Sequence, residues 1–180
     1  MTKQLGFSFD QNICVGCEAC RVACQVSHDL DESVSWRKVD KFTITDHGRK
    51  RDVFLSHACM HCENPTCMKV CPMKCFTKTV DGAVILNNEK CIGCKSCIKA
   101  CPYGAISTNP STGKSEKCDL CADMLKMGEL PACVQSCPVQ ALKVIEIGKD
   151  DSKLVKEAIG MKQTPTRPSM RFVKPRVLGL

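Results

Sequence analysis

Sixteen of the 17 cysteines fall into four groups of four, and thiolates are ligands for iron–sulfur clusters and for zinc. Within each group the cysteines lie a few residues apart, except for one longer gap in the last group. The groups are Cys14, Cys17, Cys20 and Cys24; Cys59, Cys62, Cys67 and Cys71; Cys91, Cys94, Cys97 and Cys101; and Cys118, Cys121, Cys133 and Cys137. This repetition indicates shared metal centres.

The spacing favours cubane 4Fe–4S clusters. The first and third groups have the C-x2-C-x2-C-x3-C run of bacterial ferredoxins, in which a tight loop supplies three ligands and the fourth cysteine ligates the neighbouring cluster. A proline follows the fourth cysteine in the last three groups, and proline suits the first turn of a helix. We therefore expect a short helix to follow the fourth cysteine of each group. These cysteines are Cys24, Cys71, Cys101 and Cys137.

Three other roles explain the cysteines less well. A secreted disulfide scaffold needs a signal peptide, and the first seven residues contain no apolar h-region. Buried structural thiols would not repeat so regularly. Structural zinc sites pair two separated C-x2-C knuckles, so a zinc-binding interaction module is a remote alternative. Metal analysis separates the two metals, because four cubanes contain about sixteen iron atoms and four zinc sites about four ions.

Cys75 is the one cysteine outside these groups. The segments 71–76, 101–106 and 137–142 repeat one another, and Cys75 occupies the position filled by Ala105 and Ala141. A small apolar residue belongs there, and a free cysteine behaves as one. We therefore exclude Cys75 from the ligands.

The formal net charge of +7 counts every thiol as neutral. A cubane with four thiolates contributes about −2, so four sites bring the total to about −1. The basic composition is thus no sign of nucleic-acid binding, and 4% aromatic residues are too few for base stacking. No apolar run is long enough to span a membrane. Lysines close to the cysteines should favour the reduced clusters; they are Lys69, Lys95, Lys99 and Lys117.

Short strands are expected beside the cysteine loops. Residues 6–10 and 142–147 have strand patterns, and residues 76–80 and 83–86 form a predicted hairpin around Asp81-Gly82. The second and third groups, with this hairpin between them, can make a complete two-cluster ferredoxin unit. The first and fourth groups must then pair across it. The predicted fold is α+β, with two pseudo-symmetric bacterial-ferredoxin-like 2×(4Fe–4S) units, one inserted in the other, short strands and helices, and long loops.

This nesting divides the chain into three parts. Residues 1–49 and 113–148 form unit A, with cysteine groups 1 and 4, and residues 50–112 form the inserted unit B, with groups 2 and 3. Residues 25–58 are expected to be a loop and strands on the surface. Residues 149–180 are expected to begin with a helix at 152–159 and to continue as a proline-rich, basic tail that is disordered or extended along a partner.

In its cysteine groups and the segments around them, the sequence resembles a known family, the iron–sulfur electron-transfer subunits of the dimethyl sulfoxide reductase family of molybdopterin oxidoreductases. The likeness covers about residues 5–147, and the tail is similar as well. It rests on the x2-x4-x3 spacing of group 2, the x2-x11-x3 spacing of group 4, the segments 91–97 and 100–105, Cys118-Asp119-Leu120-Cys121, and the tail from Thr166-Arg167-Pro168 to Lys174-Pro175.

The resemblance implies four 4Fe–4S clusters with exchanged ligands. One cluster would be held by Cys14, Cys17, Cys20 and Cys137, and its neighbour by Cys118, Cys121, Cys133 and Cys24. The third would be held by Cys59, Cys62, Cys67 and Cys101, and the fourth by Cys91, Cys94, Cys97 and Cys71. Some relatives have tryptophan at the position of Cys94 and a 3Fe–4S cluster there, so the cysteine in this chain implies a fourth cubane.

The resemblance also implies partners. The chain would be a non-catalytic subunit that relays electrons between a quinol-linked membrane anchor and a molybdenum or tungsten molybdopterin catalytic subunit, with dimethyl sulfoxide reductase the most similar complex. A formate dehydrogenase, hydrogenase or carbon monoxide dehydrogenase is the alternative. The subunit would be cytoplasmic, bound to the membrane through its partners, or exported attached to a signal-bearing catalytic subunit. The sequence itself contains no recognisable substrate site.

Overall fold

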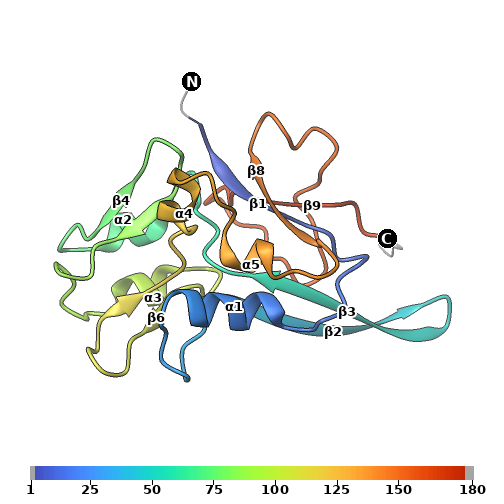
Figure 1. The fold of residues 1–180 in the computed structure, drawn as a ribbon, viewed down its shortest axis with the longest axis horizontal. Helices are drawn as coiled ribbons and strands as arrows, with labels where there is room; N and C mark the ends of the chain where they lie inside the picture. The colour runs from blue at the N-terminus through green and yellow to red at the C-terminus, as the bar shows by residue number, and fades with distance from the viewer. Residues whose placement is uncertain (1–2, 177–180) are drawn as a thin grey trace.

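The computed structural model describes residues 3–176, which form short helices and strands joined by long loops (Figure 1). In chain order the elements are β1 (Leu5–Phe9), α1 (Ala19–Ser27), β2 (Lys38–Asp46), β3 (Arg49–His57), α2 (Thr66–Val70), β4 (Phe76–Lys78), β5 (Val84–Leu86), α3 (Ser96–Ala100), β6 (Ser107–Thr108), β7 (Ser115–Glu116), α4 (Ala122–Lys126), α5 (Ala132–Gln135), β8 (Leu142–Glu146) and β9 (Met170–Phe172). No helix in the described part of the chain is long and apolar enough to cross a membrane.

One three-stranded sheet joins the two ends of the described chain. Its order is β8-β1-β9, so the N-terminal strand lies between two strands from the C-terminal third (Figure 1). β1 pairs antiparallel with β8 from Leu5↔Glu146 to Phe9↔Leu142, and parallel with β9 from Phe7↔Met170 to Phe9↔Phe172. The predicted strands at 6–10 and 142–147 are thereby confirmed to within one residue. Helices α1 and α5 also contact each other.

The segment between these ends contains three hairpins. The predicted hairpin around Asp81-Gly82 is confirmed as β4 and β5, with Gly82 at φ +81°, where glycine is favoured. A smaller hairpin pairs β6 with β7. Helices α2 and α3 contact each other, and a separate buried apolar cluster includes Cys67, Cys75, Phe76, Val84, Cys97 and Ile106.

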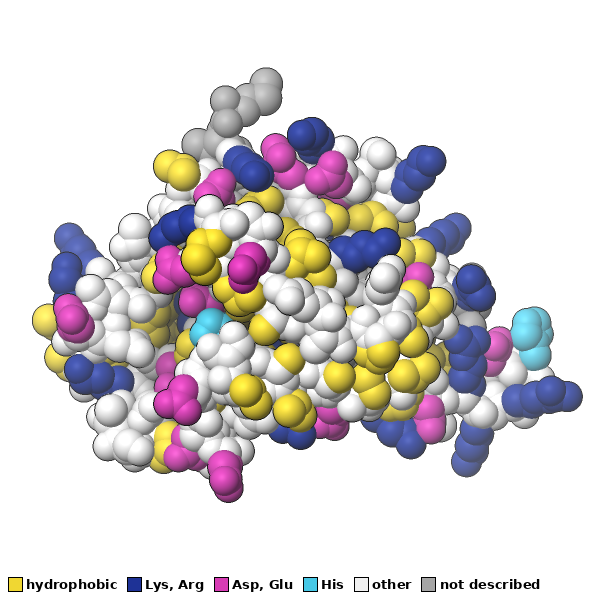
Figure 2. All heavy atoms as spheres, viewed as in Figure 1, with side chains coloured by type: hydrophobic (Ala, Val, Ile, Leu, Met, Phe, Trp, Pro, Cys, Tyr) yellow, Lys and Arg dark blue, Asp and Glu magenta, His cyan; other side chains and the backbone are white. Residues whose placement is uncertain are grey.

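The longest hairpin, β2–β3, extends from the body of the molecule (Figure 1). Its free end carries many Lys and Arg side chains (Figure 2), including the exposed Arg49, Lys50 and Arg51. This hairpin accounts for the strands expected within residues 25–58. Its strands pair from Lys38↔His57 to Asp46↔Arg49, so the predicted boundary between residues 49 and 50 separates two paired strands.

The prediction of helices after the fourth cysteines is wrong. Helices α2 and α3 end immediately before Cys71 and Cys101, and both of these cysteines have extended backbone, with ψ near 111° and 113°. The cause is the following proline, because its ring disfavours helical backbone in the preceding residue. Cys24 precedes glutamine instead, and α1 continues through it to Ser27. Proline therefore ends these helices and does not begin new ones.

Two expectations for the C-terminal segment, the helix at 152–159 and a disordered tail, are wrong for the residues that the structure describes, while contact of the tail with a partner stays a prediction and residues 177–180 lie outside the described part. Residues 152–159 contain no helix, and the segment after them packs on the rest of its own chain. Thr166, Ser169, Met170 and Phe172 are buried. Backbone hydrogen bonds join Asn64 N to Thr166 O at 3.0 Å and Ser169 N to Met60 O at 2.9 Å. The two apolar residues of β9 alternate into the core, and this contact outweighs the proline-rich and basic composition.

Candidate iron–sulfur cluster sites

The loops of the first and third cysteine groups have the same backbone conformation. Gly16 and Gly93 lie between the first two cysteines of their groups and have φ of +71° and +68°. Glu18 and Lys95, which follow the second cysteines, have φ of +59° and +60°. These left-handed residues turn the chain so tightly that a β-carbon on Gly93 would lie 2.7 Å from the carbonyl oxygen of Gly113. The C-x-G-C spacing thus produces two equivalent loops, as the repeat predicts.

A repeated turn follows the fourth cysteine of the last three groups. The amide three residues later donates to the cysteine carbonyl at 3.1–3.2 Å, and that third residue has positive φ; the three residues are Lys74, Gly104 and Gln140. In two of the turns the next amide points at the cysteine sulfur. Cys75 N lies 3.4 Å from Cys71 Sγ, and Ala141 N lies 3.3 Å from Cys137 Sγ. Amides directed at sulfur stabilise a thiolate ligand.

Two hollows are each lined by three cysteines from one group and one from another. Cys91, Cys94 and Cys97 line the first together with Cys71, and Cys75, which belongs to no group, lines it as a fifth cysteine. Cys14, Cys17 and Cys20 line the second together with Cys137. Most of the other lining side chains are apolar, including Phe76, Leu86 and Ile92 in the first hollow and Phe9, Val39 and Leu142 in the second. Four thiols around an apolar hollow fit a cubane cluster.

The remaining ligand candidates form two further neighbourhoods. The charges of Cys133 and Cys121 act on the Cys24 thiol, which joins a member of group 1 to group 4. The charges of Cys59 and Cys101 act on both Cys62 and Cys67, which joins a member of group 3 to group 2. The charges of Cys24 and Cys133 also act on Cys118, so all sixteen predicted ligands lie in cysteine-rich neighbourhoods. They are Cys14, Cys17, Cys20, Cys24, Cys59, Cys62, Cys67, Cys71, Cys91, Cys94, Cys97, Cys101, Cys118, Cys121, Cys133 and Cys137.

Burial determines the electrostatics of these thiols. Loss of water, together with the charges of neighbouring cysteines, raises the pKa of Cys24 and of Cys67 to about 12. Cys94 is the exception, because hydrogen bonding to Ser96 lowers the pKa of its exposed thiol. Eight of the sixteen thiols have a raised pKa and therefore keep their protons until a cation binds, and coordination to iron deprotonates a thiol.

Two buried cations lie among the cysteines. Lys117, which the sequence singled out, is 3% exposed, and its Nζ donates to the carbonyl oxygens of Val84 and Cys118. The other three lysines singled out with it, Lys69, Lys95 and Lys99, are exposed. Arg37 was missed by sequence reasoning and is 1% exposed. No local pattern around Arg37 reveals its burial, because the cysteines near it come from groups 1 and 4.

Sequence reasoning also missed His28. Its Nε2 lies 3.3 Å from Cys121 Sγ and 3.7 Å from an oxygen of Asp119, and its ring lies 4.7 Å from that of Trp36. His28 is 93 residues from Cys121 in the chain, so spacing gave no signal. A histidine next to a ligand thiol can orient it by a hydrogen bond.

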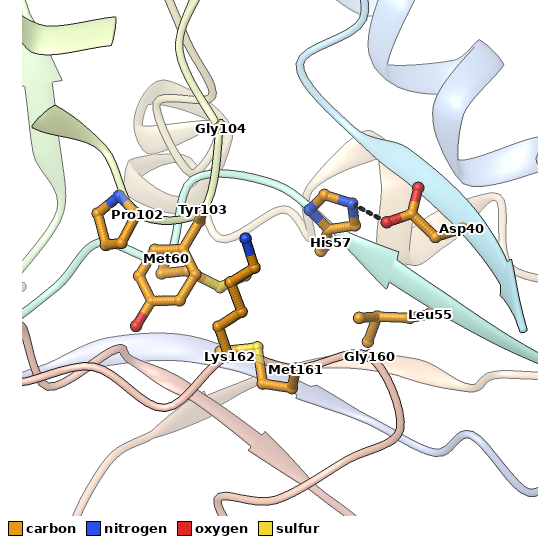
Figure 3. Close-up of a pocket in the computed structure, with 10 residues that line it drawn as sticks. All are labelled: Asp40, Leu55, His57, Met60, Pro102, Tyr103, Gly104, Gly160, Met161 and Lys162. Carbon is orange, nitrogen blue, oxygen red and sulfur yellow. Dashed lines mark hydrogen bonds and ion pairs between the residues drawn. The ribbon is translucent and has the colours of Figure 1, made fainter. Parts of the chain in front are cut away.

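A further hollow lies beside the second and third cysteine groups and contains no cysteine (Figure 3). His57 and Asp40 come from the β2–β3 hairpin and are joined at 3.0 Å, while Tyr103 follows Cys101. Lys162, from the C-terminal segment, closes the opposite wall. The Tyr103 hydroxyl also lies 2.6 Å from Thr164 Oγ1, so the C-terminal segment packs directly beside a cysteine loop.

Comparisons with known proteins agree with this chemistry. A 4Fe-4S dicluster domain matches residues 50–147, and a 4Fe-4S binding domain matches residues 11–27. The B subunit of anaerobic dimethyl sulfoxide reductase from Escherichia coli K12 is 38% identical over 99% of this chain and 89% of its own length. Thiosulfate reductase electron transfer subunit PhsB of Salmonella typhi is 36% identical over 91% and 85%.

The B subunit of polysulfide reductase from Wolinella succinogenes is 38% identical over 87% of this chain and 83% of its own length. The likeness to all three relatives extends far beyond the cysteine loops, since it covers most of each protein. The domain matches identify the bound group as an iron–sulfur cluster and exclude the zinc alternative. This chain therefore belongs to the family of iron–sulfur electron-transfer subunits that includes the B subunit of dimethyl sulfoxide reductase.

Proposed function

We propose that this chain relays electrons one at a time through four 4Fe–4S clusters, between a quinol-linked membrane anchor and a molybdopterin catalytic subunit. The observation that carries the proposal is that the fourth cysteines of two groups line hollows with the first three cysteines of other groups. Cys137 lines a hollow with group 1, and Cys71 lines a hollow with group 3. Each cluster, when bound, would accept and release one electron. Because each cluster of a pair would take a cysteine from the other's group, the two clusters would lie close enough for electron transfer.

The proposed ligand sets are those that the family resemblance implies, and they are supported by the two hollows and by thiols of each remaining set that act on one another. They are Cys14, Cys17, Cys20 and Cys137; Cys118, Cys121, Cys133 and Cys24; Cys59, Cys62, Cys67 and Cys101; and Cys91, Cys94, Cys97 and Cys71. Unit A would contain the first two sets and unit B the last two. Pairing of β1 with β8 and contact between α1 and α5 support unit A, while contact between α2 and α3 supports unit B.

A relay needs an accessible cluster at each end. Cys17 and Cys94 are the exposed members of their groups, and they occupy equivalent positions in the two repeated loops. The neighbouring Val15 and Ile92 are 60% and 63% exposed. The cluster of group 1 in unit A and that of group 3 in unit B would therefore lie nearest the surface. This arrangement suits a protein with one partner at each end.

The catalytic partner is proposed from the relatives, whose names specify reductases of dimethyl sulfoxide, thiosulfate and polysulfide. By this analogy the partner holds molybdopterin and reduces an oxidised sulfur compound, and the anchor supplies electrons from quinol. The chain would be held at the membrane by these partners, on the side where the catalytic subunit works.

Paired cysteine substitutions test the ligand sets by metal content. In the full chain, Cys137→Ser or Cys17→Ser alone should each reduce the iron content from about sixteen to about twelve. The two changes together should still leave about twelve iron atoms, because both act on one cluster. Cys137→Ser combined with Cys121→Ser should leave about eight.

The control is Cys75→Ser, which should retain about sixteen iron atoms because Cys75 is outside every proposed set. Iron and acid-labile sulfide are measured on the same samples. If Cys137→Ser and Cys121→Ser instead act on one cluster, and Cys17→Ser acts on another, each group closes on its own cluster and the proposed exchange is wrong.

A further inference from the structure

Arg37 lies just before β2, and its side chain is among the most deeply buried in the protein, at 1% exposed. Its Nη1 donates to Ser56 Oγ at 3.2 Å, and that oxygen lies 3.3 Å from Cys20 Sγ. The guanidinium stacks over the Phe7 ring, 4.5 Å from the ring centre. Its Nε and Nη2 have no hydrogen-bond partner among the described residues.

A buried guanidinium without a counter-charge is costly, because removing an ion from water carries a penalty of several kcal/mol. Four of the six other arginines in the described chain reach a carboxylate within 4.0 Å, namely Arg21, Arg51, Arg167 and Arg171, and the remaining two, Arg49 and Arg176, are exposed to water. Arg37 has no such ion pair in the described residues. The groups that act on its charge are instead Cys133, Cys118, Cys20 and Cys24.

These four cysteines divide between two of the proposed ligand sets. Cys20 belongs to the set of group 1, and the other three belong to the set of group 4. Each set with its cluster carries about −2. We propose that Arg37 lies between the two clusters of unit A, neutralises part of their charge, donates its free Nε–H and Nη2–H to their sulfur atoms, and so raises the reduction potentials of both. This inference rests on the proposed ligand sets.

The direction of the effect follows from charge. Reduction adds one electron to a cluster and makes its site more negative, so a fixed cation in a dry interior favours the reduced form. Hydrogen bonds to cluster sulfur act in the same direction. The guanidinium stays protonated throughout, so no proton accompanies the electron. Lys117 differs, because its ammonium already donates to the carbonyl oxygens of Val84 and Cys118.

The test is a redox titration followed by electron paramagnetic resonance on the cluster-loaded full chain, purified with its partners. The variants are Arg37→Gln, which removes the charge, and Arg37→Lys, which keeps the charge but loses the planar fork of donors. The control is Arg51→Gln, which changes an arginine that is exposed and pairs with Asp46 at the hairpin end. Signals are assigned with Cys17→Ser and Cys121→Ser, each of which removes one cluster of unit A.

We expect both unit A potentials to fall in Arg37→Gln, to fall less in Arg37→Lys, and to stay at their native values in Arg51→Gln. The two unit B potentials should stay unchanged in every variant. If Arg37→Gln is too unstable to keep all its clusters, selective loss of the unit A pair, with retention of that pair in Arg37→Lys, supports the same assignment. A change in none of the potentials, an equal change in all four, or loss of the unit B pair overturns it.

The iron content of the unaltered protein is measured first. A value well below sixteen would contradict the four-cluster function itself. Because that result concerns the native protein, it is distinguishable from a failure of the Arg37 inference, which appears only in the comparison of variants.

Discussion

Replacing Phe172 with alanine tests the finding that the C-terminal segment is part of the folded core. Phe172 is 0% exposed and belongs to β9, which has only three residues. Truncating a fully buried phenylalanine costs about 3–5 kcal/mol. Since about 1.4 kcal/mol is a factor of ten in an equilibrium, the open form of this segment should become roughly a hundred to several thousand times more populated.

Hydrogen exchange in the cluster-loaded full chain is the appropriate assay, because it reports local opening. Three amides report on the segment: Ser169 N donates to Met60 O at 2.9 Å, Phe172 N to Val155 O at 2.8 Å, and Val173 N to Phe9 O at 3.1 Å. Their exchange should accelerate by about the same factor as the population of the open form.

Val173→Ala is the matched control, since Val173 is the next residue and is 37% exposed. A change at so exposed a position should alter stability by only about 0.5 kcal/mol. If the three amides of Phe172→Ala remain as protected as those of Val173→Ala, the segment is not held by its apolar side chains and the reasoning fails.

Three further predictions concern the clusters and pH. Cys94→Trp should convert one cubane to a 3Fe–4S cluster, because tryptophan offers no thiolate. The expected result is a new paramagnetic signal from the oxidised protein, with three cubanes retained. Joint loss of two clusters would count against the prediction. Removing all clusters with a chelator should abolish cooperative unfolding monitored by circular dichroism, since cluster binding and folding are coupled; a sharp transition in the apoprotein would contradict this. Burial lowers the pKa of His61 well below 6.5. The folded state then binds fewer protons than the unfolded state, so stability should fall as pH drops below about 6.5, by about 1.4 kcal/mol per unit at most, until the folded pKa is reached. His61→Gln should remove this part of the slope, whereas the same change at His47, with a side chain 98% exposed, should not.

Local sequence signals predicted the short-range structure well. The Asp81-Gly82 turn and the alternation in residues 142–147 identified their hairpin and strand, because both depend on nearby residues. The cysteine spacing likewise predicted the two equivalent loops around Gly16 and Gly93. The helix error had a local cause, since proline after Cys71 and Cys101 restricts the residue before it.

Apart from the pairing of the first and fourth cysteine groups, long-range features were not predictable from one sequence. Met170 and Phe172 lie among prolines and arginines, and their place in the core depends on β1, which is far away in the chain. The burial of Arg37 could not be predicted either, because the thiols around it come from both ends of the chain. Patterns within a short window carry no information about such partners.

The β8-β1-β9 sheet has a consequence for the order in which the chain folds. The ribosome releases β1 long before its two neighbours in the sheet, residues 142–146 and 170–172. The hairpin β4–β5 and the contacting helices α2 and α3 lie entirely within residues 66–100 and can form much earlier. Synthesis therefore favours maturation from the inside outward, with β1 unpaired until residues 142–172 have been made.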